Sequence, residues 1–177
     1  MRYTARNHFT DLVIAAAVIA AHALITAPIY AATPPEKAQS ATSATAGNEE
    51  AQRGQYLINI MGCNDCHTPG YAQAAGNVPE SAWLTGDALG YKGAWGTTYP
   101  ANLRLLFASM TRDQWIKYAK SAETRPPMPW FTLRATSERD LGAMYAYMKT
   151  LGPAGKPAPA YVPPGQQPAG PVVQFPQ

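Results

Sequence analysis

The five residues Cys63-Asn64-Asp65-Cys66-His67 form a C-x-x-C-H motif, which constrains the structure more than any other part of the chain. This pattern is typical of the covalent attachment site of a c-type haem. Each thiol adds across one haem vinyl group, and the adjacent imidazole is presented to the iron. The motif therefore predicts one haem c bound covalently by Cys63 and Cys66, with His67 as an axial ligand of the iron.

The chain has only two cysteines, and both lie in the motif, which narrows the alternatives. A structural zinc site needs four ligands, and besides His67 the chain offers only His8 and His22, near its N-terminus. A redox dithiol usually opens a helix after a strand, whereas this motif follows a segment with helical periodicity. Haem attachment is the favoured interpretation, and a dithiol without haem is the remaining alternative.

Residues 1–32 have the pattern of a secretory signal peptide. Arg2 and Arg6 precede an apolar run over residues 12–27, and small residues follow it. In bacteria, haem is attached to C-x-x-C-H after export, so an exported, periplasmic chain agrees with the motif. The alternative is an uncleaved anchor over residues 12–32, because about 20 apolar residues can span a bilayer. Only in that case do we expect an association with the membrane.

Composition divides the rest of the chain into three parts. Residues 33–48 are rich in Pro, Ala, Ser and Thr, which predicts a flexible linker. Residues 153–177 hold eight Pro and three Gly, which predicts an extended tail rather than a helix. The segment between them, residues 49–152, is expected to form one compact haem domain. Four apolar residues of the tail offer contacts with the domain surface: Tyr161, Val162, Val173 and Phe175.

Helical periodicity and capping signals predict three helices in the domain. The first is expected over residues 48–62, from an Asn N-cap to a glycine. Thr111 and Gln114 form a capping box that starts the second helix. Ser137 is the expected N-cap of the third, which stops at Gly152.

The second axial ligand decides what the iron can do. A His/Met pair raises the reduction potential and suits electron transfer, whereas an open position suits gas binding or peroxide chemistry. Met128 is the favoured ligand, because prolines hold residues 125–130 extended and a stiff loop can present a weak thioether. Met110 is the rival. Met144 and Met148 lie on the apolar face of the third helix and are expected to fill the core.

Three features follow one another along the chain: the C-x-x-C-H motif after a short helix, the loop Pro127-Met128-Pro129, and a closing helix with the sequence TSERDLGAMYAYMKTLGP. Over residues 50–152 they resemble a class I c-type cytochrome domain. The domain is similar in particular to single-haem units of cytochrome subunits of periplasmic dehydrogenases. In those units a loop often reads Trp-Gly-Thr-x-Tyr-x-x-Asn-Leu, which residues 95–103 match.

The resemblance implies an all-α fold, with three to five helices around one covalently bound haem and long loops. It implies haem thioethers at Cys63 and Cys66, a proximal bond from His67 and a distal bond from Met128. The Gly-rich segment 68–100, which shows little periodicity, is expected to wrap around the haem.

The resemblance also suggests supporting contacts. Gly54 is expected to pack against an aromatic residue of the last helix, either Tyr145 or Tyr147. The proximal imidazole is expected to donate its second N–H to a backbone carbonyl, supplied by Pro69 or Pro79. Candidates for hydrogen bonds to the haem propionates are Trp95, Tyr99 and Arg125.

The expected function is one-electron transfer, as a diffusible shuttle or as the cytochrome partner of a dehydrogenase. The protein is then a carrier and not itself an enzyme, and its partners are redox proteins: a dehydrogenase donor and an oxidase or reductase acceptor. The alternative is a haem enzyme or gas-binding protein with an open or labile sixth iron site. A net charge of +3 without a basic cluster gives no indication of nucleic-acid binding.

Overall fold

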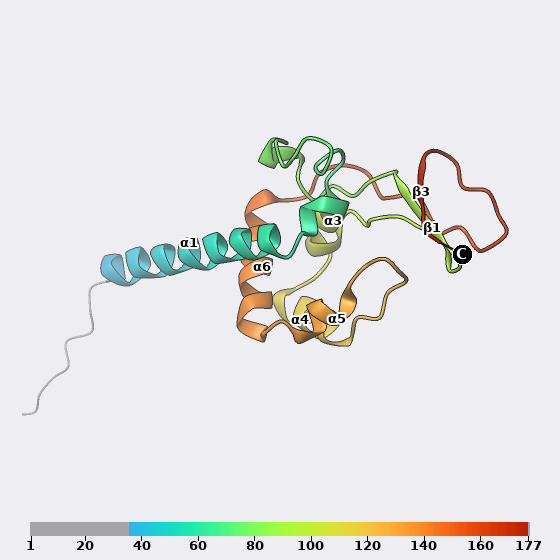
Figure 1. Cartoon of the computed structure of the whole chain (residues 1–177). Helices are drawn as coiled ribbons and strands as arrows, with labels where there is room; N and C mark the ends of the chain where they lie inside the picture. The colour runs from blue at the N-terminus through green and yellow to red at the C-terminus, as the bar shows by residue number, and fades with distance from the viewer. Residues whose placement is uncertain (1–35, 177) are drawn as a thin grey trace, which may run out of the picture. The chain divides into compact units, whose positions relative to one another are not determined.

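The structure is a computed structural model that describes residues 36–176, with side chains from residue 45 onward. The predicted signal peptide, residues 1–32, lies outside the described residues. In chain order the elements are α1 (Glu36–Ile60), α2 (Cys63–His67), the 3-10 helix η1 (Glu80–Ala82), β1 (Gly90–Gly93), β2 (Gly96–Thr98), α3 (Leu103–Ala108), α4 (Arg112–Ser121), α5 (Trp130–Ala135), α6 (Glu138–Leu151) and β3 (Val172–Gln174) (Figure 1). Among the described helices, none combines the length and the apolar character that a membrane span requires.

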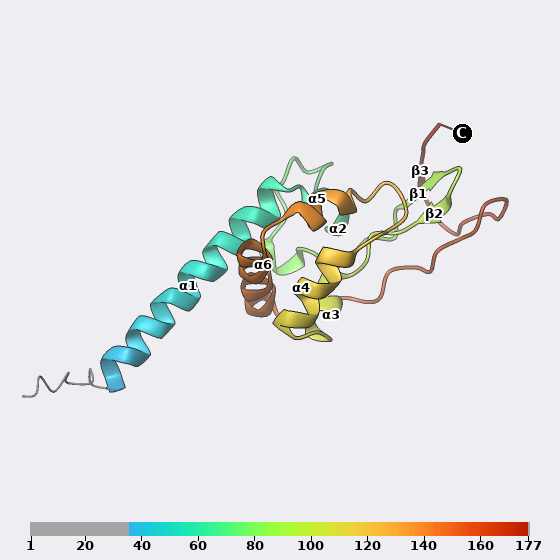
Figure 2. The ribbon, with the colours of Figure 1, turned by 90° about the horizontal axis from the view of Figure 1, so that it is seen from below.

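Helix α1 begins at Glu36, so the N-cap predicted at Asn48 is wrong (Figures 1 and 2). The segment is rich in alanine, which has the highest helix propensity, and residues 36–46 contain neither Pro nor Gly. Residues 45–50 are all exposed, and Ala51 is the first buried position in the described chain. Residues 45–50 of α1 are therefore helical without support from the core.

Helices α1 and α6 pack closely together at Gly54. A Cβ atom at this position would overlap the carbonyl of Ala143 and lie 2.8 Å from the Cβ of Tyr147. Of the two aromatic residues expected here, Tyr147 is the one that packs on Gly54, and its hydroxyl donates a hydrogen bond to Glu80 (2.6 Å). The hydroxyl of Tyr145 instead donates to a carbonyl in the α3–α4 turn. The missing side chain thus sets the distance between the two helices.

The capping signals in the sequence correctly predict where α4 and α6 begin. Thr111 and Gln114 form the predicted capping box of α4, and the Ser137 hydroxyl accepts a hydrogen bond from the third residue of α6. The described chain contains six α-helices rather than three to five, because α2, α3 and α5 have only five or six residues each. Helices of this length show no periodicity in the sequence. The fold is mostly helical, as expected.

A buried arginine binds the last carbonyl groups of α6. Arg104, on α3, is 6% exposed, and its guanidinium donates hydrogen bonds to the carbonyls of Leu151 and Gly152. A third bond reaches the carbonyl of Ser81 (3.2 Å). The last carbonyls of a helix have no partner within the helix, so Arg104 joins the end of α6 to α3 and to the η1 segment.

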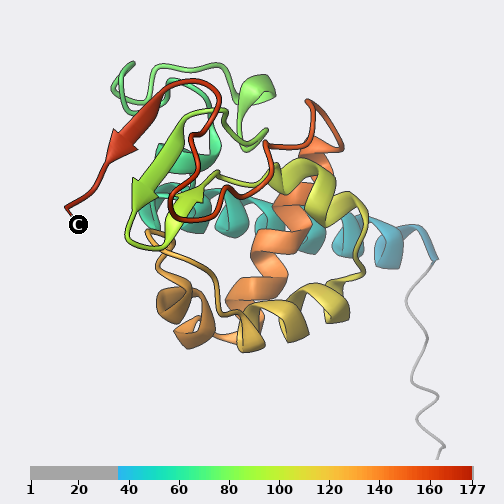
Figure 3. The ribbon, with the colours of Figure 1, turned by 90° about the vertical axis from the view of Figure 1, so that its right-hand side faces the viewer.

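A small sheet that the sequence did not predict joins the Gly-rich segment to the tail. Its strand order is β2-β1-β3, with β1 antiparallel to β2 and parallel to β3 (Figure 3). Tyr91 is the residue of β1 that lies opposite both Thr98 and Val173. The strands have three or four residues and include several glycines, so no alternating pattern marks them. The Pro-rich tail is extended, as predicted, and lies against the domain.

Candidate functional site

The C-x-x-C-H motif itself forms α2, a short helix that follows α1 after a tight turn. Gly62 makes this turn with φ 68°, in the left-handed region that glycine adopts without strain. Asn64 is buried within the motif and accepts a hydrogen bond from the Thr68 hydroxyl (2.7 Å), while its amide donates to the side chain of Asn59 (3.1 Å). These bonds fix the motif between the end of α1 and the following loop.

The side chains of the motif line a cavity of about 880 Å³. Cys63, Cys66 and His67 contribute from α2, and Met128 contributes from the loop between α4 and α5. A volume of this order is typical of pockets that enclose a whole organic ligand. Most of the wall is apolar, and part of it belongs to the core or packs against it, including Ile58, Leu103, Phe107, Trp115, Leu133 and Met144.

The imidazole of His67 is buried and held by one hydrogen bond. Its Nδ1 lies 2.7 Å from the carbonyl oxygen of Ala101. A carbonyl only accepts, so Nδ1 carries the hydrogen and Nε2 keeps a lone pair free for a metal. Burial lowers the pKa of His67, and the bond to Ala101 opposes this only in part. The ring is therefore neutral at neutral pH, which is the form that binds iron.

The expectation that Pro69 or Pro79 supplies this carbonyl is wrong. The loop that follows the motif turns back, and the N–H of Gly86 donates to the carbonyl of His67 (2.8 Å). This turn brings the segment before α3 against the imidazole, with Ala101 as the acceptor. The acceptor is set by the path of a long loop and not by local spacing.

Cys63 and Cys66 are not joined by a disulfide. Burial raises the pKa of Cys63 to about 11. The phenol of Tyr91, on β1, forms a hydrogen bond with the Cys66 thiol. Burial is the main cause that raises the pKa of this phenol, and the hydrogen bond raises it further. A redox-active dithiol usually has one thiolate stabilised near neutral pH. Cys63 is therefore protonated at neutral pH and has no stabilised thiolate.

Of the two methionines considered as sixth ligand, Met128 lies at the cavity. Its loop is fixed by the hydroxyl of Thr98, which donates to the carbonyl of Pro126 (2.8 Å). Met110 lies outside the cavity lining, and its carbonyl accepts a hydrogen bond from Tyr145 (3.0 Å). The fold thus brings Met128, and not Met110, to the cavity that the motif lines.

A covalent attachment motif, a neutral histidine and a methionine share one apolar cavity, and a comparison with protein families agrees with this arrangement. The family model for cytochrome c matches residues 51–152. The chain belongs to the cytochrome c family. It is a class I c-type cytochrome, a family that binds haem c covalently with its iron and transfers electrons through it. Searches of curated proteins and of solved structures returned no match.

The cavity of this cytochrome also contains polar groups where haem propionates could bind. Tyr99 and Arg125 line the cavity, as the resemblance suggested. Trp95 lies outside the lining and packs against Phe175, with ring centroids 5.4 Å apart. Thr124 was missed from the sequence: the residue lines the cavity, and its buried hydroxyl has no hydrogen-bond partner among the described residues. A lone threonine carries no sequence signal, whereas its orphaned hydroxyl fits a ligand with acceptor oxygens.

Proposed function

We propose that this cytochrome carries single electrons in the periplasm, with His67 and Met128 as the axial ligands of its haem iron. It acts as a shuttle or as the cytochrome partner of a dehydrogenase. One observation carries the proposal: His67 and Met128, from separate elements, line the same apolar cavity as Cys63 and Cys66. Bound haem supplies a one-electron Fe(III)/Fe(II) couple, and a His/Met pair favours the reduced state.

The residues of the chain bind, orient and shield the cofactor. Cys63 and Cys66 would hold the haem by two thioether bonds, so the carrier cannot lose it. His67 is oriented by the bond to Ala101, and Met128 closes the iron to small ligands. Each cycle would take one electron from a donor protein and pass one to an acceptor.

The location and the partners are inferred from the sequence. The basic, then apolar, N-terminal segment supports export to the periplasm, where c-type haem is attached. Family membership implies redox proteins as partners. In the proposed role these are a dehydrogenase as donor and an oxidase or reductase as acceptor. Residues 95–103, which match the loop of dehydrogenase cytochrome subunits, support the role of dehydrogenase partner.

The decisive test is the visible spectrum of the exported protein, oxidised and reduced, with a carbon monoxide challenge. We expect a low-spin haem with a weak sulfur-to-iron band at long wavelength and no reaction with carbon monoxide. Met128→Ala is expected to lose this band and to bind the gas. Met110→Ala is the matched control, because Met110 lies outside the cavity lining, and it is expected to keep the wild-type spectrum.

Other outcomes would replace the proposal. If the wild-type protein binds carbon monoxide, the sixth site is open or labile, and a haem enzyme or gas-binding protein is the better interpretation. If Met110→Ala, and not Met128→Ala, loses the band, the ligand assignment is wrong. A protein without visible bands would be a dithiol protein.

A further inference from the structure

The C-terminal tail lies outside the family match and yet helps to line the haem cavity. The match ends at residue 152. Pro159 and Tyr161 nevertheless line the cavity together with Cys63, His67 and Met128. Part of the cavity wall is therefore formed by residues that lie outside the matched cytochrome c domain.

Hydrogen bonds hold the first part of the tail at two places. The side-chain amide of Asn102 donates to the carbonyls of Ala154 (2.8 Å) and Lys156 (3.0 Å). Thr97 and Val162 then exchange two backbone hydrogen bonds, of 2.8 and 3.0 Å. The tail takes part in all four of these hydrogen bonds through its backbone groups, so it follows a defined path beside the residues that precede α3.

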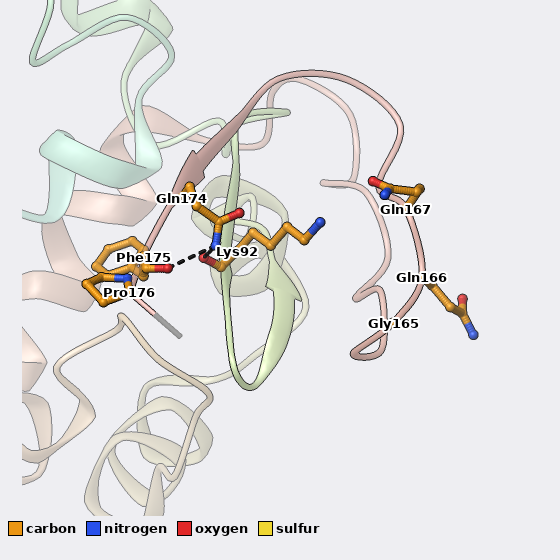
Figure 4. Close-up of a pocket in the computed structure, with 7 residues that line it drawn as sticks. All are labelled: Lys92, Gly165, Gln166, Gln167, Gln174, Phe175 and Pro176. Carbon is orange, nitrogen blue, oxygen red and sulfur yellow. Dashed lines mark hydrogen bonds between the residues drawn. The ribbon is translucent and has the colours of Figure 1, made fainter.

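The end of the tail is held by the sheet. Strand β3 runs parallel to β1, and the N–H of Phe175 donates to the carbonyl of Lys92 (2.8 Å). The side-chain amide of Gln174 donates to the carbonyls of Lys92 (3.3 Å) and Phe175 (2.9 Å) (Figure 4). The phenyl ring of Phe175 packs on Trp95. Anchors on both sides of residues 159–161 therefore keep this segment at the cavity.

Gly96 shows that the domain is shaped to receive the tail. It has φ 95°, and a Cβ atom there would overlap the carbonyl of Val162 and lie 2.9 Å from the Tyr161 hydroxyl. All of these close contacts are with the tail. A side chain at this position would therefore push the tail away from the cavity.

Tyr161 connects the tail to the loop that carries Met128. Its hydroxyl donates to the carbonyl of Trp95 (2.8 Å), which fixes the ring. The guanidinium of Arg125 lies over the ring, 3.9 Å from its centroid. Arg125 stands three residues before Met128, and residues 125–127 are exposed, so the core does not hold this part of the loop. The ring of Tyr161 supports this part of the loop, which is not held by burial in the core.

We propose that residues 153–176 form a strap that completes the haem cavity, and that Tyr161 in this strap is a positioning residue that holds the Met128 loop through Arg125. The inference rests on the proposed function, because it takes Met128 as the iron ligand. A thioether is a weak ligand, so the fraction of molecules with the iron–sulfur bond open depends on how firmly the loop is held. The strap also keeps water from one side of the haem, which favours the less charged ferrous state.

The test compares Tyr161→Ala and Tyr161→Phe in the full-length protein with haem attached. A cation–π contact contributes about 0.5–2 kcal/mol, so we expect Tyr161→Ala to bind carbon monoxide about two to thirty times faster than the wild type. Its reduction potential should fall, and the sulfur-to-iron band should be lost at a lower pH. Tyr161→Phe keeps the ring beneath Arg125 and should lie closer to the wild type.

Two further variants isolate the proposed contact. In a double-mutant cycle, Arg125→Ala combined with Tyr161→Ala should change carbon monoxide binding by less than the sum of the two single variants, because both changes remove the same interaction. Val173→Ala, at an exposed position of β3, is the control within the strap and should match the wild type. Hydrogen exchange is the readout that is independent of the haem iron: the amides of Thr97 and Val162 should be protected in the wild type.

The outcomes separate this inference from the proposed function. A wild-type protein without a sulfur-to-iron band contradicts the proposed function. A second outcome is that the wild type shows that band while Tyr161→Ala leaves carbon monoxide binding, the reduction potential and the pH stability of the band unchanged. This result contradicts only the role of Tyr161. Free exchange of the Val162 amide in the wild type contradicts the strap.

Discussion

At Gly54 the lack of a side chain determines how closely α1 and α6 approach. A Cβ atom there would overlap the backbone carbonyl of Ala143, which cannot move without shifting α6. We therefore expect Gly54→Ala to lower the free energy of unfolding by about 1–3 kcal/mol, the usual cost of overpacking a core. Urea unfolding of the protein with haem attached, followed by circular dichroism, measures this change.

Gly47 provides the matched control in the same helix. It is exposed, and a Cβ atom there would meet no other atom within 4 Å. Gly47→Ala should leave stability unchanged or raise it by up to about 1 kcal/mol, because alanine favours helix. Equal effects at the two glycines would show that Gly54 is not in close contact with α6.

His67 shows how far a single residue can be interpreted from the sequence. The motif predicts its role, and general chemistry predicts that its second nitrogen donates to a carbonyl. The identity of that carbonyl, Ala101, depends on a turn closed by Gly86, far from the motif in the sequence. Local chemistry was therefore predictable, whereas the partner supplied by a long loop was not.

At the scale of elements, Arg104 stabilises the end of α6. Its guanidinium donates to the carbonyls of Leu151 and Gly152, and it is buried. Bonds to charged groups contribute about 1.5–3 kcal/mol each, and unsatisfied buried carbonyls are costly. Arg104→Met should therefore lower the free energy of unfolding by roughly 2–5 kcal/mol, measured by chemical unfolding.

Arg104→Lys tests whether geometry or charge matters more. Lysine keeps the charge but lacks the planar fork that reaches several carbonyls at once. We expect it to recover less than half of the stability lost in Arg104→Met. A methionine variant as stable as the wild type would mean that water replaces the guanidinium at the end of α6.

The elements predicted from the sequence are those with a local signal. Helices α4 and α6 each begin at a capping residue, Thr111 and Ser137, and their starts were predicted correctly. Helices α3 and α5 are too short to show periodicity. The sheet depends on pairing between residues 90–98 and the tail, which no local pattern encodes. The prolines around Met128 exclude helix and predict a loop there, and Tyr161 was expected to contact the domain as an apolar residue of the tail, whereas nothing in the sequence marks Arg104.

At the scale of the whole molecule, the haem cavity and the hydrophobic core share several residues, such as Ile58, Phe107 and Met144. Each of the six α-helices contributes at least one residue to the cavity, and so do β1, β2 and the tail. Without a ligand, the apolar wall of this cavity would be exposed to water, which is unfavourable. Folded domains are stable by only about 5–15 kcal/mol. We therefore expect the described fold to depend on a ligand in this cavity.

Folding and haem attachment should accordingly be coupled, and the variant Cys63→Ser/Cys66→Ser tests this because it removes both attachment points. Its purified chain, free of haem, should lose most of the helical circular dichroism signal and the cooperative thermal transition. Added haem should restore part of both, since His67 and the apolar wall remain. Met128→Ala, which keeps the covalent attachment, is the control and should stay helical. A haem-free double variant with wild-type helicity and a cooperative transition would show that the helices pack without the cofactor, and that haem is added to a fold already formed.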